Sequence, residues 1–264
     1  MSARNRIVVI TGGSKGIGLS TALAFQRQGD TVYVLSRTVP KAEGLLHIET
    51  DVTNPDACTN AAERITKEVG RIDVLILNAG SGVSGTVEHT PLSDAHGQFD
   101  VCFFGALHVL KPCLPLLRAS KGIVLFLSSV AGVTPIPFQA FYSAAKAAVC
   151  SLVGALRNEL RPHGVRVAAV LPGDVKTEFT HARTKQAEGS ELYPALVRSV
   201  ARMEHDEQNG MSPERIANKL VRLSKKRHPK PYCTVGIQYQ IILVLMKVLP
   251  SRLSNWIIGL LYAK

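Results

Sequence analysis

Residues 7–18 read Ile-Val-Val-Ile-Thr-Gly-Gly-Ser-Lys-Gly-Ile-Gly, and much of the architecture follows from this stretch. Its first four residues are apolar, which is typical of a buried strand, and a helical pattern follows from Gly16 to about Gln28. A glycine-rich turn between a strand and a helix is the context of a phosphate site, because the helix N-terminus offers amide hydrogens and a partial positive charge. Gly12 permits the tight turn, and Gly16 and Gly18 let the backbone approach a pyrophosphate. A turn that needs glycine only for its dihedral angles is the alternative.

Apolar runs and helical patterns alternate along the rest of the chain, which indicates a parallel sheet with crossover helices. Asn54 and Pro55 are suited to cap and to start one of these helices. We therefore predict an α/β fold, a Rossmann-like doubly wound parallel sheet of about seven strands with helices on both faces and an apolar C-terminal helical extension. The expected strands are residues 7–10, 31–36, 46–49, 72–77, 122–128, 165–171 and 232–235. The expected helices are residues 16–28, a helix that begins at 55, residues 91–117 and residues 141–160.

The composition fits a globular protein. The chain has 264 residues, of which 46% are apolar and 19% are charged, which supplies a core and argues against disorder. We divide it into a cofactor-binding domain over residues 1–235 and an apolar, basic extension over residues 236–264. Residues 174–211 follow the sixth strand and contain no clear strand of their own. We expect them to form a lid with some helix over the substrate, with an ordinary surface loop as the alternative.

Positive charge is concentrated near the C-terminus. The net charge is +11, and residues 215–264 contain ten Lys or Arg and no Asp or Glu. The apolar runs 237–249 and 253–262 are each shorter than the ~20 residues that span a membrane. With the basic run 225–230 they suit the surface of an anionic membrane, so we expect peripheral contact through residues 237–264. The alternative is a helical pair buried in a homodimer or against the domain, and we expect a homo-oligomer.

The cysteines and the N-terminus indicate the compartment. Five cysteines are scattered without the spacing of a metal site, and the first residues run straight into a strand, which leaves no room for a signal peptide. We expect reduced thiols, no metal, and a cytoplasmic protein that contacts the cytosolic face of a membrane. We do not expect nucleic-acid binding, because no recognition motif accompanies the positive charge.

Tyr142 and Lys146 lie four residues apart in Tyr-Ser-Ala-Ala-Lys, so both side chains project from one face of a helix. A free tyrosine titrates near ~10 and is a poor acid or base at neutral pH. A neighbouring ammonium favours the phenolate and lowers the pKa of the phenol. The pair therefore indicates a proton donor and acceptor, and the glycine-rich turn indicates that the proton accompanies a hydride from a dinucleotide.

The end of the second expected strand indicates which dinucleotide binds. An acidic residue there would contact the ribose 2′-hydroxyl of NAD, but this chain has Ser36 and Arg37. Lys15 in the glycine turn adds a second cation, and two cations can converge on a 2′-phosphate. We expect NADP(H) as the cofactor, with solvated surface charges at Lys15 and Arg37 as the alternative.

Six motifs in sequence order resemble the short-chain dehydrogenase/reductase family over about residues 5–235. They are Thr11-Gly-x-x-x-Gly16-Ile-Gly18, Asp51-Val52, Asn78-Ala79-Gly80, Ser128-Ser129, Tyr142-x-x-x-Lys146 and Pro172-Gly173. Within that family, residues 132–138 and the C-terminal tail look most similar to hydroxysteroid and retinol dehydrogenases. The resemblance implies that Ser129, Tyr142 and Lys146 are catalytic. It implies that the cofactor is bound by Thr11, Gly12, Ser14, Lys15, Gly16, Ile17, Gly18, Ser36, Arg37, Asp51, Val52, Asn78, Ala79, Gly80, Tyr142, Lys146, Pro172, Gly173, Val175 and Thr177.

One position departs from the family pattern. Cys102 stands where the family usually has an asparagine that helps to hold a water in the proton relay to the lysine. A thiol is only a weak hydrogen-bond donor. Either the backbone carbonyl still holds the water and the enzyme works, or the relay is impaired and turnover falls. A redox or nucleophilic thiol is a third interpretation.

The combined pattern predicts an NADP(H)-dependent oxidoreductase. It would interconvert a ketone and a secondary alcohol, or an aldehyde and a primary alcohol. The long lid and the apolar extension suggest a hydrophobic substrate such as a steroid, a retinoid or a long-chain lipid. The alternative is a catalytically weak scaffold or sensor that binds NADPH in the same fold.

Overall fold

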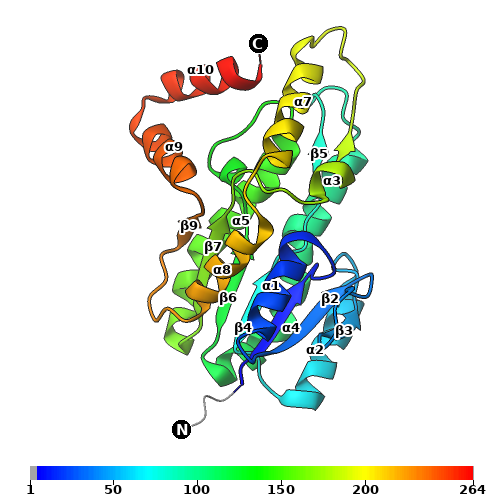
Figure 1. Ribbon diagram of the computed structural model, residues 1–264, viewed down its shortest axis with the longest axis vertical. Helices are drawn as coiled ribbons and strands as arrows, with labels where there is room; N and C mark the ends of the chain where they lie inside the picture. The colour runs from blue at the N-terminus through cyan, green and yellow to red at the C-terminus, as the bar shows by residue number, and fades with distance from the viewer. Residues whose placement is uncertain (1–4, 264) are drawn as a thin grey trace.

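The central sheet has seven parallel strands in the order β3-β2-β1-β4-β6-β7-β9 (Figure 1). A computed structural model describes residues 5–263. After β3, which lies at one edge, the chain passes back across β2 and β1 and forms β4 on the other side of β1. The sheet is therefore doubly wound, and the predicted Rossmann-like fold is confirmed. The strands are β1 (Ile7–Thr11), β2 (Thr31–Ser36), β3 (Leu46–Glu49), β4 (Val74–Leu77), β6 (Ile123–Leu127), β7 (Arg166–Leu171) and β9 (Tyr232–Thr234).

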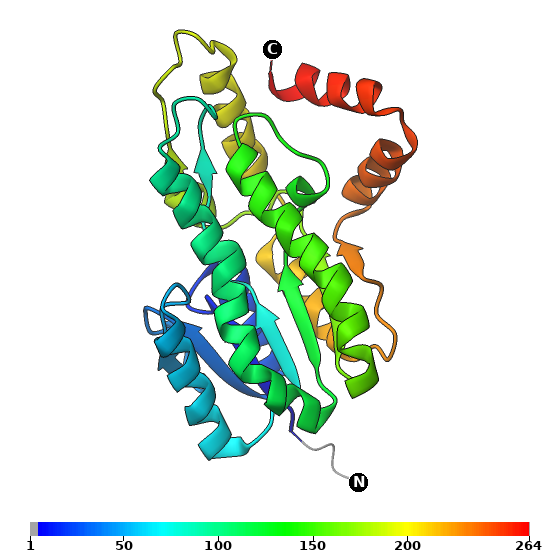
Figure 2. The ribbon, with the colours of Figure 1, turned by 180° about the vertical axis from the view of Figure 1, so that it is seen from behind.

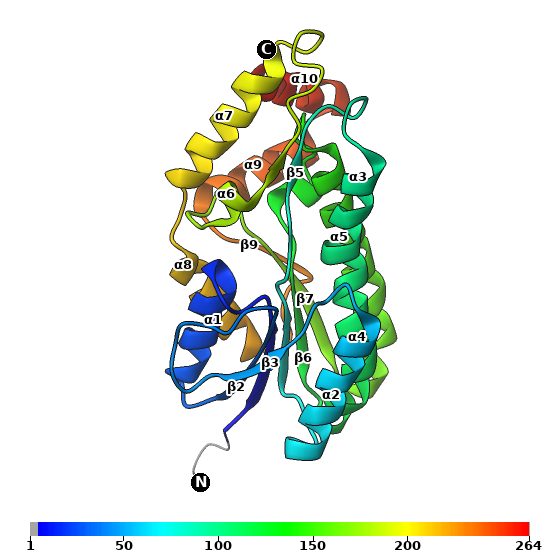
Figure 3. The ribbon, with the colours of Figure 1, turned by 90° about the vertical axis from the view of Figure 1, so that its right-hand side faces the viewer.

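Helices cover both faces of the sheet, as the side view in Figure 3 shows. Val8 and Ile10 point into the core on one face, and Ile7 and Val9 point into the core on the other, because successive strand residues alternate. Burial of these two apolar layers is the main source of stability. The first core is closed by α1 (Gly16–Gln26) and α8 (Pro213–Ser224), and the second by α2 (Pro55–Val69), α4 (Gly105–Ser120) and α5 (Ala140–Glu159). Short 3₁₀ turns occur at Val130–Gly132 and Arg161–His163.

The start of α2 confirms the predicted cap. Asn54 Oδ1 accepts hydrogen bonds from the backbone amides of Asp56 at 3.0 Å and Ala57 at 3.1 Å, and Pro55 occupies the first helical position. Gly70 ends the helix with a φ of 65°, a left-handed conformation that costs glycine little. Local sequence alone therefore sets both ends of this helix.

The helix expected over residues 91–117 contains one wider turn. It consists of α3 (Leu92–Phe99), a π-helix (Asp100–Phe104) and α4. Such turns inside α-helices occur often at functional sites, and no sequence pattern marked this one. The whole run Leu92–Ser120 has 29 residues and is long and apolar enough, by length and composition, to cross a membrane. In this fold it packs with α2 and α5 over the sheet.

Residues 174–211, the segment predicted as a lid, have more structure than the sequence predicts. The expected helix is present as α6 (Phe179–Ala182) and α7 (Ala195–Gln208), but the expectation of no strand is wrong. β8 (Thr184–Lys185) pairs with β5 (Val83–Ser84), which follows β4, and so ties the lid to the domain. Two-residue strands carry no detectable periodicity, so sequence patterns could not show them.

The predicted apolar extension forms two helices, α9 (Ile237–Val248) and α10 (Ser251–Tyr262), which follow β9 along one side of the molecule (Figures 1 and 2). α9 has no fully buried side chain. The basic run 225–230 does not lie beside these helices. Arg166 at the start of β7 donates to Lys226 O at 2.8 Å, so the run lies at the opposite end of β9 from α9.

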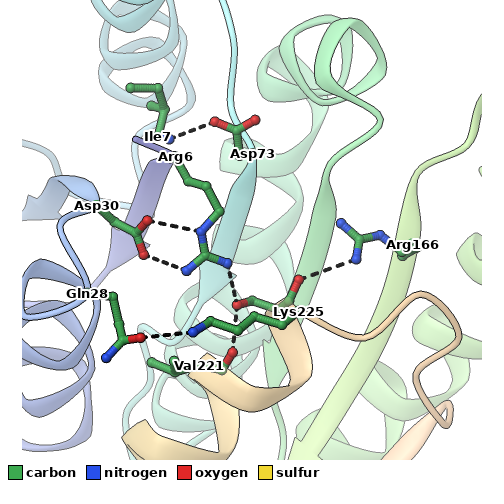
Figure 4. Close-up of polar contacts among 9 residues, drawn as sticks. Arg6, Ile7, Gln28, Asp30, Asp73, Arg166, Val221 and Lys225 are labelled. Carbon is green, nitrogen blue, oxygen red and sulfur yellow. Dashed lines mark hydrogen bonds and ion pairs between the residues drawn. The ribbon is translucent and has the colours of Figure 1, made fainter. Parts of the chain in front are cut away.

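Arg6 connects three elements at the N-terminal edge of the sheet (Figure 4). Its Nε lies 3.0 Å from Asp30 Oδ1, its Nη2 lies 2.5 Å from Asp30 Oδ2, and its Nη1 donates to Ser224 Oγ at 2.8 Å. These contacts join the residue before β1 to the turn before β2 and to the end of α8. The side chain of Asp30 is only 6% exposed, so its charge depends on the guanidinium.

We expect Arg6→Ala to destabilise the fold, because it leaves the buried carboxylate of Asp30 without its cation. Loss of the partner of a buried charged group costs about 2–3 kcal/mol, which lowers the Tm of a chain of this size by about 4–10 °C. Thermal unfolding followed by circular dichroism measures the change. Lys225→Ala removes an exposed hydrogen bond to Gln28 nearby and should shift Tm by less than about 2 °C. Equal Tm values for the two variants would contradict the role of Arg6.

Candidate functional site

The C-terminal ends of the parallel strands surround one cavity of about 530 Å³. Open α/β sheets bind ligands at this edge, beside the point where the strand order reverses. Every residue that the sequence predicted for the cofactor or the reaction lines this cavity, with the exception of Thr11. The fold therefore brings motifs from distant parts of the chain to one place.

The glycine-rich turn is packed so closely that a side chain does not fit. A Cβ atom on Gly18 would lie 2.2 Å from Gly12 O and 2.6 Å from Asn78 Nδ2. Gly12 itself has a φ of 63°. α1 begins at Gly16, and the preceding Lys15 provides no side-chain hydrogen bond to the helix. The first amides of α1 therefore reach the cavity without a side-chain cap, as an anion site requires.

Thr11 and Asn78 support this turn from behind. Thr11 Oγ1 accepts hydrogen bonds from the backbone amides of Asn78 at 2.9 Å and Ala79 at 3.0 Å. In return, Asn78 Nδ2 donates to Thr11 O at 2.9 Å and to Gly12 O at 3.1 Å. Thr11 is 2% exposed and does not reach the cavity surface, so it acts on the site only through these bonds.

One end of the cavity carries the predicted cations, Arg37 and Lys15. Lys15 Nζ lies 3.8 Å from Glu178 Oε2, but both side chains are more than half exposed, so this ion pair is weak. The backbone amide of Thr53 donates to Asp51 Oδ1 at 2.9 Å and, with the charge of Arg37, holds the pKa of Asp51 below its ordinary value. Asp51 is therefore an ordered carboxylate beside the cations.

The other end of the cavity contains Ser129, Tyr142 and Lys146. Ser129 follows β6, its Oγ accepts a hydrogen bond from the backbone amide of Ala131 at 3.1 Å, and it lines the same cavity as Tyr142. Lys146 lies one helical turn after Tyr142 on α5, and its Nζ is 5.8 Å from the centre of the tyrosine ring. Lys146 Nζ also donates to Leu127 O at 2.9 Å, which fixes the position of the ammonium.

Burial changes the acidity expected for Tyr142. Burial raises its pKa above the ordinary value, and the Lys146 ammonium and the hydrogen bond with Ser129 lower it only in part. The predicted effect of the lysine has the right sign, but the predicted net result is wrong, because desolvation of the phenolate is larger. Burial also lowers the pKa of Lys146, whereas its ionisable neighbours Cys102 and Tyr142 raise it above the ordinary value. At neutral pH the site holds a neutral phenol beside an ammonium.

Cys102 lies behind the cavity wall, in the π-helix, and is 3% exposed. Its Sγ accepts a hydrogen bond from Gln98 Nε2 at 3.0 Å and approaches Ser81 O at 3.7 Å. No motif in the sequence connects Gln98 with the site. The spacing of four residues between Gln98 and Cys102, one helical turn, was the signal that could have done so.

The lid and α10 contribute cavity residues that no motif identified. The ring centre of Phe179 lies 5.9 Å from that of Tyr142. Ala182 and Met203 add apolar surface, and Tyr262 of α10 reaches the same cavity. These residues have no regular spacing in the sequence, because the folded path of the lid and α10 brings them to the cavity.

The cavity fits a nicotinamide dinucleotide by its construction. A close-packed glycine turn at an uncapped helix start suits a pyrophosphate, and cations at one end suit a phosphate on the adenosine half. A phenol beside an ammonium suits the reacting end. A Cβ atom on Gly16 would lie 3.5 Å from Thr177 Cβ, so the start of the lid packs against the glycine turn.

Comparison with known proteins agrees with this geometry. The sequence model of the short chain dehydrogenase family matches residues 6–188. The chain is 34% identical over 264 residues to the 3-ketodihydrosphingosine reductase of Bacteroides thetaiotaomicron, with 98% of each chain covered. It is 31% identical over 274 residues to the NADPH-dependent 3-dehydrocapnine reductase of Ornithobacterium rhinotracheale, with 95% of each chain covered. The solved structure of a short-chain dehydrogenase from Streptomyces avermitilis matches with a TM-score of 0.86 and 25% identity over 97% of both chains.

Proposed function

We propose, because this chain belongs to the short-chain dehydrogenase family, that it is an NADPH-dependent reductase of a hydrophobic carbonyl compound. As a member of that family the protein is an oxidoreductase that uses a nicotinamide cofactor to interconvert alcohol and carbonyl groups of a small molecule. One observation carries the finer proposal: a single cavity joins the cation Arg37 to Tyr142 and Lys146. Oxidation of the alcohol is the reverse reaction of the same site.

Three side chains have separate tasks in the proposed reaction. Tyr142 donates its proton to the carbonyl oxygen, and its raised pKa keeps the phenol protonated at neutral pH. Ser129 donates a hydrogen bond to the same oxygen and stabilises the negative charge that develops there. Lys146 stabilises the phenolate that remains, because its ammonium is fixed 5.8 Å from the ring centre. The cofactor, when bound, supplies the hydride.

Arg37 and Lys15 support NADPH rather than NADH. A phosphate monoester carries about −1.5 to −2 charges and three acceptor oxygens, which a guanidinium and an ammonium bind well. β2 ends at Ser36, followed by Arg37, so neither position offers a carboxylate to a ribose 2′-hydroxyl. The name of the dehydrocapnine reductase relative includes the same cofactor.

The cavity wall on the lid side supports a hydrophobic substrate. Phe179, Met203 and Tyr262 supply large apolar surfaces there, and Ile136 adds another from the segment before α5. One relative that covers nearly the whole chain is named for reduction of a keto derivative of dihydrosphingosine. We therefore place a long-chain keto lipid ahead of steroids and retinoids as the substrate class.

We further propose that α9 and α10 bring the enzyme to the cytosolic face of an anionic membrane. Val244 and Val248, 65% and 78% exposed, belong to an apolar stripe along α9. Trp256 of α10 is 60% exposed and suits a membrane interface. Residues 236–263 include Lys247 and no Asp or Glu. All five cysteines are unpaired, which suits a reducing compartment. A homo-oligomer that buries the same stripe is the rival.

The cofactor proposal predicts a selective effect of Arg37→Ala. NADPH binding should weaken by about 10- to 100-fold, because a charge-assisted hydrogen bond contributes about 1.5–3 kcal/mol. NADH has no phosphate at that position, so its Kd should change by less than about threefold. Fluorescence titration measures both. Lys41→Ala, which removes an exposed cation outside the cavity, is the control. Tighter binding of NADH than of NADPH by the wild type would contradict the cofactor assignment.

The proton-donor role predicts a loss of activity and a pH dependence. Tyr142→Phe should lower kcat by about 10²- to 10⁴-fold, whereas the Kd of NADPH, which many other residues bind, should change by less than about tenfold. In the wild type, kcat/KM for reduction should stay constant near neutral pH and fall in alkali, because ionisation removes the proton to be donated. Oxidation of the alcohol should rise over the same range. NADPH consumption with long-chain keto, steroid, retinal and small-ketone substrates measures these rates.

The control for this experiment is Tyr33→Phe, whose hydroxyl bonds to Glu68 outside the cavity. It should leave both the rate and its pH profile unchanged. Wild-type protein that binds NADPH but turns over none of these compounds would favour the scaffold or sensor alternative. Full activity of Tyr142→Phe would exclude the proposed mechanism.

The membrane proposal predicts that Val244→Glu weakens vesicle binding by about tenfold or more, because it introduces a charge into the apolar stripe. Flotation with phosphatidylserine-containing and with neutral phosphatidylcholine vesicles measures this binding. Val87→Glu, at a valine that is 62% exposed near the start of α3, should bind like the wild type. Wild-type protein that binds neither vesicle, and a dimer that Val244→Glu splits, would show that a second copy covers the stripe.

A further inference from the structure

One narrow face of α9 is turned toward the domain. Tyr239, Leu243 and Met246 are half-buried and follow one another at helical spacing, while every other residue of the helix is exposed. Leu243 packs against the core on one side of the sheet. Tyr239 carries the only hydroxyl of this face, so it alone can attach α9 to the domain by side-chain hydrogen bonds.

The ring of Tyr239 lies in a socket formed by Gly173, Gly236 and Met211. A Cβ atom on Gly173 would lie 2.2 Å from Cε1 and Cζ of the ring. A Cβ atom on Gly236 would lie 3.0 Å from Cδ2 of the ring and 3.1 Å from Met211 Cε. Gly236 also has a φ of 92°, which favours glycine. The two glycines thus leave the space that the ring fills at the end of β7.

The hydroxyl of Tyr239 makes two hydrogen bonds with Asp174. It accepts from the Asp174 backbone amide at 3.0 Å and donates to Asp174 Oδ2 at 2.6 Å. Among residues 5–263, Asp174 forms no ion pair. Burial raises the pKa of Asp174 above its ordinary value, and the bond from Tyr239 lowers it in part. The phenol therefore stabilises the charged form of this carboxyl group.

Gly173 and Asp174 belong to the cavity wall at its reacting end. They follow β7, and both line the cavity. The backbone amide of Val130 donates to Pro172 O at 2.9 Å, which ties this segment to the 3₁₀ turn after β6. Arg37 follows β2, and three strands lie between β2 and β7 in the sheet. The contact of α9 is therefore at the nicotinamide half of the proposed cofactor site, away from the half that would bind the phosphate.

We propose that Tyr239 is a positioning residue that holds Gly173 and Asp174 in the arrangement that fits the nicotinamide half of NADPH, so that the attachment of α9 and the binding of the cofactor stabilise each other. This inference rests on the proposed NADPH-dependent function. Tyr239 does not line the cavity itself, so it acts through the two residues that it contacts. Two events that favour the same arrangement of one segment reinforce each other by the same factor, because coupling between binding free energies is reciprocal.

Two variants separate the hydroxyl of Tyr239 from its ring. Tyr239→Phe keeps the ring in the socket and removes both hydrogen bonds, so the Kd of NADPH should rise about 3- to 10-fold, and Tyr239→Ala, which also empties the socket, should raise it at least about tenfold. Adenosine 2′,5′-bisphosphate lacks the nicotinamide half, so its Kd should change by less than about twofold in both variants. Fluorescence titration and competition measure these values. Tyr33→Phe is the matched control, because it removes another phenol-to-carboxylate bond, to Glu68 at 2.7 Å, outside the cavity.

Hydrogen exchange provides a readout independent of activity. In the wild type, NADPH should slow amide exchange in α9, Ile237–Val248, by about threefold or more, whereas adenosine 2′,5′-bisphosphate should leave it unchanged. Tyr239→Ala should abolish this effect of NADPH. In turnover, the loss should appear in KM for NADPH, with kcat at saturating NADPH within about threefold of the wild type.

Two results would overturn the role of Tyr239 and leave the reductase function standing. One is wild-type affinity for NADPH in both variants, with exchange in α9 that NADPH does not change. The other is an equal loss of affinity for NADPH and for adenosine 2′,5′-bisphosphate with a lower Tm, which indicates that Tyr239 only stabilises the fold. If Tyr239→Ala does not fold, Tyr239→Phe decides between these outcomes. Wild-type protein that does not bind NADPH would refute the cofactor and this coupling together, whereas coupling in a protein that reduces no carbonyl compound would refute the reductase function alone.

Discussion

The backbone of Gly18 approaches that of Gly12 so closely that no side chain fits between them, and the site depends on this contact. It holds the first turn of α1 against the end of β1. Asn78 Nδ2, at the end of β4, donates a hydrogen bond to the same carbonyl, Gly12 O. Contacts at this one carbonyl therefore hold together the start of α1 and the ends of β1 and β4. In the proposed function the uncapped amides of α1 bind the pyrophosphate without any charged side chain, and the cations Arg37 and Lys15 add selectivity for NADPH.

The parallel direction of the strands brings the other site residues to the same edge of the sheet. Asn78 follows β4, Ser129 follows β6 and Gly173 follows β7, so three distant motifs meet at one edge because every strand runs in the same direction. Tyr142 and Lys146 come instead from α5, and their distance from Ser129 depends on how that helix packs. The bond from Lys146 Nζ to Leu127 O, the last residue of β6, connects the helix to the strand that carries the serine.

Features with a fixed spacing could be predicted from the sequence, whereas contacts across the fold could not. Strand and helix periods located the sheet, and the Asn54 cap located the start of α2. The family resemblance supplied the predicted site residues, all of which line the cavity except Thr11, which lies behind the wall. The π-helix and the pairing of β5 with β8 depend on packing and leave no period in the sequence. The net pKa of Tyr142 depends on the depth of its burial, which no motif encodes. The run 225–230 precedes the apolar helices by few residues, yet β9 separates them in space.

The apolar extension is part of the cavity wall. The ring of Tyr239 in α9 lies where a side chain on Gly173 would be, since a Cβ atom there would be 2.2 Å from the ring. The Tyr239 hydroxyl accepts from the Asp174 amide at 3.0 Å and donates to Asp174 Oδ2 at 2.6 Å. Burial raises the pKa of Tyr239 to about 12, so it remains a donor at neutral pH. At the other end, Tyr262 of α10 lines the same cavity. Gly173 and Asp174, which Tyr239 contacts, line the cavity, as does Tyr262, so a partner or membrane that shifts α9 or α10 would also shift the wall of the cavity.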